Sequence, residues 1–566
     1  MNALSLGLWL LAGGPVSADT SVLTPDSLEI IRHDALEGSS ALISSDSLVY
    51  QWAQQYLHSK TKEATVQRFL ISGIGDTLDG LRRSETGRIL RAQRFLADAS
   101  VTTRTDSLTG RKILRAETWD QWSLSVPLSV SRAGGEFSWI VGVSEANVLG
   151  TGQAVGGFYS STALRQSWLV NYGNNAFAMP RGRLAFSAAS SSDGFSGSFE
   201  VGMPLRSRYD DFGIVLSGLQ NRYTRTFDLP TTMRAESGAG WASGCPEGEC
   251  QWILYPNSFK QSLKLAVTAA GGEDVQVQGS LIGELYQDST GSARVPSTFP
   301  ATLLPLFRSR PELGAWATGR PSRDDQRLGL SLVVKRMRYW SAKNFQNLKW
   351  TEDVPLGWSL ESTLLWNLAS QGERKSGAWM RQAMGWSLLP WKDWYLAASG
   401  TTEWFAGGET GPDQGTGIGK LEARWFPAPN WQTLGAASID AAFFQPEAWT
   451  QYTLGEDNNL PGFLARSFAG KSRMLVTVEE RWTPPVEALT VVPALAVFAG
   501  AGQVSSTPEP WEGTGWKAGF GLGLRFGMSR SIDGVVNHLS ISRPWGGASP
   551  FALKPWMISF GSRQSL

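Results

Sequence analysis

The sequence predicts an all-β transmembrane β-barrel with a small α+β domain in front of it, and three observations support this fold class. Many segments alternate apolar and polar residues with period two, as strands with one apolar and one wet face do. In one of these segments, Trp516–Phe526, the polar face carries three glycines beside Lys and Arg, which suits a water-filled lumen better than the inner face of a soluble sandwich. The uninterrupted apolar runs all stay well short of the 18 or so residues of a membrane helix.

The first 18 residues are typical of a signal peptide. An apolar run, Leu4–Leu11, is followed by Val16-Ser17-Ala18 directly before Asp19, which is the small-x-small pattern of a cleavage site. We therefore expect the chain to be exported. Because only helices and closed barrels satisfy every backbone hydrogen bond in lipid, an exported chain without a spanning helix is either soluble or a barrel.

Composition is compatible with both of these alternatives. The 566 residues include 62 Gly and 26 Trp, and the formal net charge is +1. Abundant Trp suits the aromatic belt of a membrane protein, although it also suits the core of a soluble sandwich. A balanced charge offers no electrostatic reason to expect a nucleic-acid partner.

Residues 19–61 are predicted to form an N-terminal extension. The part up to Ser45 is polar and irregular. From Asp46 to His58 the apolar residues recur at intervals of three and four, which predicts one amphipathic helix. We expect its apolar stripe to pack on the following domain rather than to bind a cofactor.

Residues 62–117 are predicted to form the small α+β domain. Val66–Ser72 has the composition of a short strand, and Arg82–Leu96 has the periodicity of a helix. Two further strands are expected, at Val101–Arg104 and at Ile113–Ala116. Strand, helix, strand, strand in so short a stretch is the pattern of one α+β unit.

Residues 118–566 are predicted to form the barrel. Trp122–Val130 and Phe137–Val143 alternate on either side of a Gly-Gly turn. In Trp516–Phe526 the large apolar side chains lie on one face, while Lys517, three glycines and Arg525 lie on the other. The longest loops are expected at Leu229–Cys250, Asp288–Asp325 and Phe405–Gly419.

The only two cysteines, Cys245 and Cys250, stand in Gly-Cys-Pro-Glu-Gly-Glu-Cys. In an exported protein, a close pair within a glycine- and proline-rich turn predicts a loop disulfide. The alternative is a metal site, which would need two further ligands, and no histidine stands nearby in the sequence.

The stretch Leu454–Trp482 combines a loop with a strand. Its first part, up to Gly470, is rich in Gly and Asn and is too broken for a helix or strand interior. From Arg473 onward, Met474, Val476, Val478 and Trp482 share one face, and Thr477, Glu479 and Arg481 share the other. Leu475 and Glu480 are exceptions to this alternation.

This stretch resembles loop six and the following strand of the BamA/TamA superfamily of outer-membrane barrels, also called the bacterial surface antigen family. Gly462 and Phe463 match the Arg-Gly-aromatic tip of that loop, but Pro461 stands in place of the Arg. Phe498-Ala-Gly-Ala-Gly502 resembles the Phe-x-Asp-x-Gly pattern that supplies the partner acid, with Gly500 in place of the Asp. Losing both charges together is nearly neutral, whereas losing one leaves the other unpaired in a partly dry lumen. The alternative is a shifted alignment, in which Arg466 takes the role of the tip arginine.

Three other segments carry the same resemblance. Glu85–Ala99, with Arg88, Arg91 and Phe95, looks like the helix-to-strand segment of a POTRA domain, although its arginines would suit an ordinary solvated helix face equally well. Asn147–Gly152 is similar to the turn after the second barrel strand, and Trp556–Leu566 resembles a degenerate terminal strand. The resemblance implies one periplasmic POTRA-like domain and a barrel of about 16 antiparallel strands in a bacterial outer membrane.

By the same resemblance, the expected function is outer-membrane protein assembly, insertion or translocation. A POTRA edge would receive an unfolded client protein or a periplasmic chaperone, and the seam between the first and last barrel strands would open sideways. We expect a monomeric barrel whose other partners are outer-membrane lipids. The first alternative is a structural or transport barrel that lost insertase activity, which the missing charge pair favours.

Enzyme signals are weak, so we predict no enzyme, no cofactor and no metal site. Gly73-Ile-Gly75 does not extend to a dinucleotide-binding pattern, and the sequence contains no phosphate-binding loop. A remote alternative is a hydrolase embedded in the barrel wall. It would require His538 within hydrogen-bond reach of a Ser or Asp at the lumen rim.

Overall fold

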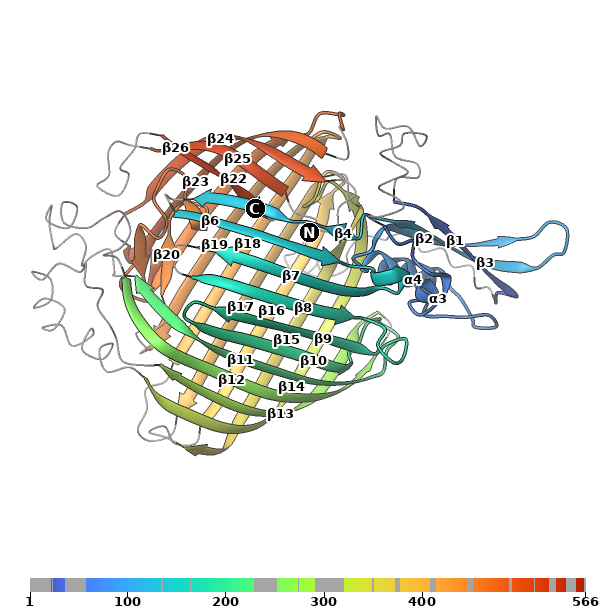
Figure 1. Ribbon diagram of the computed structural model, residues 1–566, viewed down its shortest axis with the longest axis horizontal. Helices are drawn as coiled ribbons and strands as arrows, with labels where there is room; N and C mark the ends of the chain where they lie inside the picture. The colour runs from blue at the N-terminus through green and yellow to red at the C-terminus, as the bar shows by residue number, and fades with distance from the viewer. Residues whose placement is uncertain are drawn as a thin grey trace, which may run out of the picture.

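The computed structural model describes residues 22, 24–35, 58–133, 136–162, 165–228, 252–272, 274–290, 320–348, 351–371, 377–407, 414–444, 451–487, 491–513, 515–528, 536–545 and 556–563. Figure 1 shows a large barrel with a small α+β domain at one end. The predicted signal peptide, nearly all of the helix predicted at 46–58, and both cysteines lie outside these residues.

The small domain is built on a three-stranded mixed sheet in the order β1-β3-β2. β1 is parallel to β3, and β2 is antiparallel to it. The helices cover one face of the sheet, where Val66, Phe69, Ile89, Leu90 and Phe95 form the core. The elements are β1 Ser27–His33, α3 Glu63–Gln67, α4 Gly80–Arg91, β2 Leu96–Thr105 and β3 Lys112–Asp120.

Two local predictions for this region are wrong. The short strand expected at Val66–Ser72 is instead α3 and the turn after it, and the spacing of three places Val66 and Phe69 together in the core. The segment expected to be irregular up to Ser45 contains β1, which adds to the sheet edge. The helix predicted at Arg82–Leu96 corresponds to α4, whose first turn is capped by the Asp79 side chain accepting from the Arg82 N–H at 2.7 Å.

The barrel is closed and antiparallel between consecutive neighbours. Two-residue turns such as 392–393 and 429–430 lie at the end where the small domain sits. Its strands are β4 Leu124–Ser125, β5 Leu128–Ala133, β6 Glu136–Glu145, β7 Gln153–Ser161, β8 Gln166–Asn174, β9 Arg183–Ser191, β10 Gly194–Met203, β11 Phe212–Asp228, β12 Trp252–Gly271, β13 Gln276–Thr290, β14 Arg320–Lys343, β15 Thr351–Gln371, β16 Gly377–Trp391, β17 Trp394–Gly407, β18 Gln414–Ala428, β19 Trp431–Phe444, β22 Ser472–Trp482, β23 Val491–Ser505, β24 Lys517–Met528, β25 Val536–Pro544 and β26 Met557–Arg563.

The described residues form twenty barrel strands, so the expectation of about 16 is wrong. The ring contains 21 labelled segments, and β4 and β5 are two pieces of one strand because both pair with β6. The number 16 came from the resemblance, since weak alternating patterns do not show where one strand ends and the next begins. The loop expected at Phe405–Gly419, for example, belongs mostly to β17 and β18.

The predicted division into an apolar outer face and a polar inner face is confirmed. On β24, Leu522 and Leu524 are exposed outward while Gly521 and Arg525 are buried inside. Tryptophans gather near the barrel end that carries the short turns, as in the aromatic girdle of outer-membrane barrels. This girdle includes Trp391, Trp394, Trp425, Trp431 and Trp482. The apolar outer face and the girdle together are the features by which a barrel spans a membrane with its strands. None of the described helices has the length and apolar character of a membrane span.

The ring closes where β26 meets β5, a junction that we call the seam. Its register contains one residue pair, Phe560 with Arg132. The neighbouring pairs are longer, since β26 pairs with β25 from Met557 to Arg563. The seam is therefore paired in register over fewer residues than the strands on either side of it.

Candidate luminal site

The connection between β19 and β22 folds into the lumen. Its described part contains β20 Tyr452–Leu454, the short 3-10 turn η4 Glu456–Asn458 and β21 Phe468–Gly470, and β20 pairs with β21. The folded part, residues 451–471, is called the inner loop below. Its apolar side chains form a core of their own with two side chains of the wall, made of Leu454, Leu460, Phe463, Phe468, Leu475 and Val504.

The predicted tip residues lie against the wall at glycines. A Cβ on Gly500 would stand 2.7 Å from the Asn459 carbonyl oxygen and 2.8 Å from Pro461 Cδ, so only glycine leaves room for the tip there. Gly462 has a φ of +80°, and its backbone passes directly over Arg543. Phe463 is 2% exposed and packs edge-on against Phe468. The structure thus brings the predicted tip and the predicted partner strand together.

Polar contacts hold the inner loop without an arginine at its tip. The Ser542 hydroxyl donates to Glu456 Oε1 at 2.7 Å, which joins η4 to β25. Arg473 donates from Nε to Asp440 Oδ2 at 2.8 Å and from Nη1 to the Thr453 carbonyl at 3.0 Å. Arg466, the alternative tip arginine, lies beyond the tip with a φ of 51°, and its N–H donates to Asp457 at 3.0 Å.

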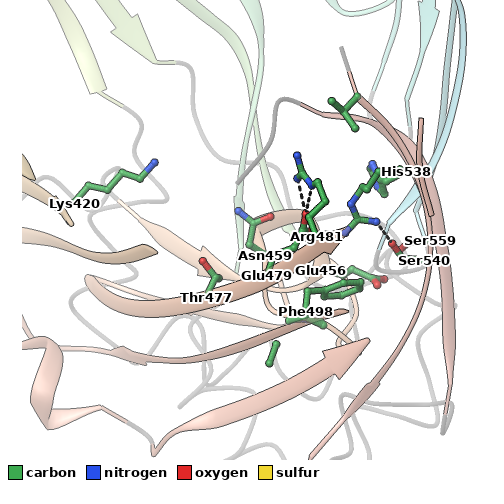
Figure 2. Close-up of a pocket in the computed structure, with 14 residues that line it drawn as sticks. Lys420, Glu456, Asn459, Thr477, Glu479, Arg481, Phe498, His538, Ser540 and Ser559 are labelled. Atoms are coloured by element: carbon green, nitrogen blue, oxygen red, sulfur yellow. Dashed lines mark hydrogen bonds and ion pairs between the residues drawn. The ribbon is translucent and has the colours of Figure 1, made fainter. Parts of the chain in front are cut away.

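A cavity of about 310 Å³ lies between the tip and the wall, as Figure 2 shows. Glu479 accepts from Arg481 Nε at 2.9 Å and from Arg525 Nη2 at 2.7 Å. Arg525 also donates to the Ser540 hydroxyl at 3.0 Å and lies over the Phe498 ring at 5.2 Å. All three charged side chains are at least nine-tenths buried, and each charge has an opposite charge in contact.

Sequence reasoning missed this buried charge cluster. It considered only the family's ion pair between loop tip and wall, and found both of its charges replaced by Pro461 and Gly500, whereas Glu479 and Arg525 form an ion pair between β22 and β24 inside the wall itself. The available signal was the alternation, which placed both residues on the lumen face of their strands. Alternation does not give the order of the strands in the sheet, and that order places β22 and β24 on either side of β23.

His538 also lines this cavity and is 9% exposed. The serine two residues along, Ser540, accepts a hydrogen bond from the Arg525 guanidinium. A cation at a hydroxyl oxygen draws electron density away from it and lowers its nucleophilicity. Ser540 therefore belongs to the charged cluster of the wall.

The predicted residues of α4 contact the barrel instead of forming a solvated helix face. Arg88 binds both oxygens of Glu85, at 2.7 and 2.8 Å, and its guanidinium lies over Tyr339 of β14 at 4.7 Å. Burial opposes ionisation of Glu85, but Arg88 outweighs it and holds the pKa of that carboxyl below its usual value. Arg91 binds both oxygens of Asp353 on β15, at 2.7 and 2.8 Å.

Phe95 contributes to the domain core and to the joint with the barrel. Its ring lies 6.0 Å from that of Phe69. A Cβ on Gly152 would stand 3.0 Å from Phe95 Cε1, so the barrel turn approaches the domain at a glycine. In the same turn, Asn147 is fully buried and donates to the Ser59 carbonyl at 3.1 Å and to Thr61 Oγ1 at 2.9 Å. The Asn-Val-Leu-Gly-Thr-Gly turn is thus a second contact between barrel and domain.

No protein-family model matches the chain, and no curated protein matches it. Among solved structures, it is similar to BamA from Haemophilus ducreyi lacking POTRA domains 1–3, at 12% identity and a TM-score of 0.36 over 99% of this chain and 94% of that one. It is similar to CdiB from Acinetobacter baumannii at 12% identity and 0.44, over 96% and 74% of the two chains. CdiB from Escherichia coli matches at 10% identity and 0.44, over 98% and 92%. The ferric preacinetobactin receptor BauA from Acinetobacter baumannii matches at 9% identity and 0.39, over 83% and 85%. Likenesses of this size assign no function.

Proposed function

We propose that this chain is an outer-membrane barrel that assembles or translocates other proteins, and that a client strand enters at the seam. The observation that carries the proposal is the single residue pair, Phe560 with Arg132, that joins β26 to β5. Each backbone group left unpaired at a strand edge is a donor or acceptor for an incoming strand. The free energy needed to separate β26 from β5 is therefore lower than that needed to separate two strands that pair along their whole length.

The small domain supports the same proposal. Its element order, with a mixed sheet of order β1-β3-β2, suits a POTRA-like module in the periplasm, and it leaves β1 and β2 as the two edges of the sheet. An edge strand receives an extended chain through backbone hydrogen bonds, with little demand on sequence. Docked at the barrel end through Arg91 and Asp353, such an edge would deliver a client close to the lumen.

A second candidate is a structural or transport barrel without insertase activity. Gly500 favours it, because the position of the family's acid is filled by the backbone of the inner loop and has no room for a side chain. In that reading the inner loop is a fixed part of the wall, and the seam stays shut. The two candidates differ in whether the seam must open during function.

The test locks the seam. In a background with Cys245 and Cys250 replaced by Ser, Arg132→Cys/Phe560→Cys places two cysteines at partner positions across the junction. Liposomes carrying this variant are given an unfolded barrel client, and folding of the client is followed by its heat-resistant migration on gels. We expect insertion by the unsubstituted barrel and by the reduced variant, and a stop on oxidation, because the disulfide prevents the seam from parting.

The matched control is Thr268→Cys/Ser280→Cys in the same background. These positions are also partners, on β12 and β13, where the pairing is continuous. Oxidation of this control should leave insertion unchanged. Insertion that continues through an oxidised seam would exclude client entry there, and no insertion by the native barrel would favour the structural or transport candidate.

A further inference from the structure

The turn between β14 and β15 crosses the lumen at the end where the small domain lies. Residues Asn344–Leu348, called the strap below, leave β14 after Lys343 and turn inward at Asn344, which has a φ of 61°. The strap contacts two separate parts of the wall. Its first part contacts β17 to β19 and its second part contacts β23 to β25, which stand farther around the ring from β14.

Phe345 forms the first contact and is 5% exposed. Its ring meets Tyr395 of β17 edge-on at 4.9 Å, and the Arg424 guanidinium of β18 lies over it at 4.1 Å. The Phe345 carbonyl accepts from Arg424 and also from Gln432 Nε2 of β19, at 3.1 Å. This end of the strap thus combines an aromatic cluster with two hydrogen bonds to buried wall residues.

Leu348 forms the second contact and is 1% exposed. It packs in a cluster with Val492 and Ala494 of β23 and Val536 of β25. On β24 between them, a Cβ on Gly527 would stand 2.7 Å from Leu348 Cβ, so the wall has a glycine where the strap touches it. An apolar side chain buried on the far side of the polar lumen thus fixes the strap across it.

The small domain holds the base of the strap. Arg91 of α4 binds Asp353, which also accepts from the Ser341 hydroxyl at 2.6 Å, so the ion pair joins both strands of the β14–β15 hairpin to the domain. Within the hairpin, Glu352 accepts from the Gln346 N–H at 2.7 Å and from Asn347 Nδ2 at 2.9 Å. The strap is therefore shaped by its own hairpin and anchored to α4.

We propose that the strap closes the lumen to ions and solutes, and that the docking of α4 on Asp353 keeps it closed. This goes beyond the proposed function, because it concerns permeability of the lumen and not insertion through the seam. Moving the domain away from the barrel end breaks the Arg91 contact and frees the base of the hairpin. Leu348 then leaves its cluster, and water connects the two ends of the lumen.

The test is ion conductance of the full-length barrel in planar lipid bilayers. Leu348→Asp places an unpaired charge in the apolar cluster, which should release the strap and raise the time-averaged conductance by about tenfold or more. The matched control, Leu360→Asn, changes a 52% exposed residue on the outer face of β15 and should conduct like the native barrel. Heat-resistant gel migration shows that each variant is a folded barrel.

A lock provides the opposite test. Leu348→Cys/Val492→Cys, in the Cys-free background, should be silent when oxidised and should show openings when reduced. The proposal that the strap closes the lumen would be wrong if a folded Leu348→Asp barrel conducts no more than the native protein. It would also be wrong if the oxidised double-cysteine variant conducts like the reduced one.

The role of α4 has its own pair of variants. Arg91→Ala should raise the frequency of openings, whereas Arg94→Ala, an exposed arginine one turn along, should not. Equal opening frequencies in these two variants would overturn control by the domain. Because conductance is measured without a client protein, its outcome is independent of the insertion test.

Discussion

His58 lies between two carboxylates where the small domain meets the barrel. Its Nε2 is 3.2 Å from Asp34 and 3.3 Å from Asp120, and its side chain is 2% exposed. Burial disfavours the charged imidazolium, but Asp120 and Asp34 outweigh burial and raise the pKa of His58 to about 9. The same contact holds the pKa of Asp34 below its usual value. The charged histidine thus ties the segment before α3 to the end of β3.

This histidine makes the joint sensitive to pH. Because the folded pKa of about 9 lies above the ordinary value of 6.5, His58 stabilises the fold most fully below pH 6.5, by an amount on the order of 3 kcal/mol. The contribution falls as pH rises and is lost above pH 9. Hydrogen exchange of β3 amides, corrected for intrinsic rates, should show less protection at pH 9.5 than at pH 6.

A His58→Gln variant supplies the control for this prediction. Its β3 protection should be lower at pH 6 and should change little between the two pH values. A native protein whose β3 protection is equal at both values, or a variant that keeps the native pH response, would contradict the assignment to His58.

At the scale of elements, β22 shows why two residues break a regular alternation. Leu475 points inward because it packs on the apolar core of the inner loop, which replaces water at that point of the lumen. Glu480 points outward near the Trp girdle, where Thr433 donates to it across the strand pair. Each exception follows from a neighbour outside the strand.

Leu475 should therefore hold the inner loop in place. Leu475→Ala removes an 8% exposed side chain from the loop core and should cost about 2–5 kcal/mol of loop attachment. Trypsin should then cut the intact barrel faster at Lys471, which is exposed at the end of the loop. Gel analysis of the fragments measures the rate.

Val476→Ala is the matched control for the loop. Val476 neighbours Leu475 but is 47% exposed on the outer face, so its truncation should leave cleavage at Lys471 unchanged. Equal cleavage in both variants would mean that the loop is held by its polar contacts, through Ser542 and Arg473, rather than by its apolar core.

At the scale of the whole molecule, hydrogen bonds and ion pairs join the small domain to the end of the barrel. The Asn147 side chain binds Ser59 and Thr61 of the domain, and its Oδ1 also accepts from the Gly152 N–H at 2.8 Å. The Lys62 N–H and the Thr65 hydroxyl both donate to the Gly150 carbonyl, at 2.9 and 2.8 Å. Arg91 binds Asp353 on another part of the barrel end, and the Arg208 N–H between β10 and β11 donates to Glu85 Oε1 at 3.2 Å, so the domain is held at three or more separate points.

Asn147→Ala should loosen one of these points. The substitution leaves buried partners unsatisfied, at about 1–3 kcal/mol for each group, so the domain should sample a wider range of positions. Spin labels at Leu108, which is 93% exposed at the tip of the domain, and at Trp168, which is 66% exposed on β8, report this range as the width of their distance distribution. Asn221→Ala, within β11, should leave the distribution as narrow as in the native protein.

The sequence by itself determined the class of fold and the face on which each residue lies. Each strand residue faces either lipid outside or water inside. The side-chain types of Leu522 and Arg525 therefore predict their faces of the barrel without information on which strands pair. The sequence also marked the inner loop and the α4 arginines as segments of interest. A local pattern identifies them because their residue types are unusual for an ordinary loop or helix.

Only the tertiary structure decided how many strands close the ring and what fills it. The number of strands depends on which segments pair, and the contacts of Gly500 with Pro461, Arg91 with Asp353, and Leu348 with Val536 join residues far apart in the chain. A glycine in the sequence shows that a side chain is missing but not which backbone approaches it. The strap and the buried Glu479–Arg525 pair arise from strand order, which no local period encodes.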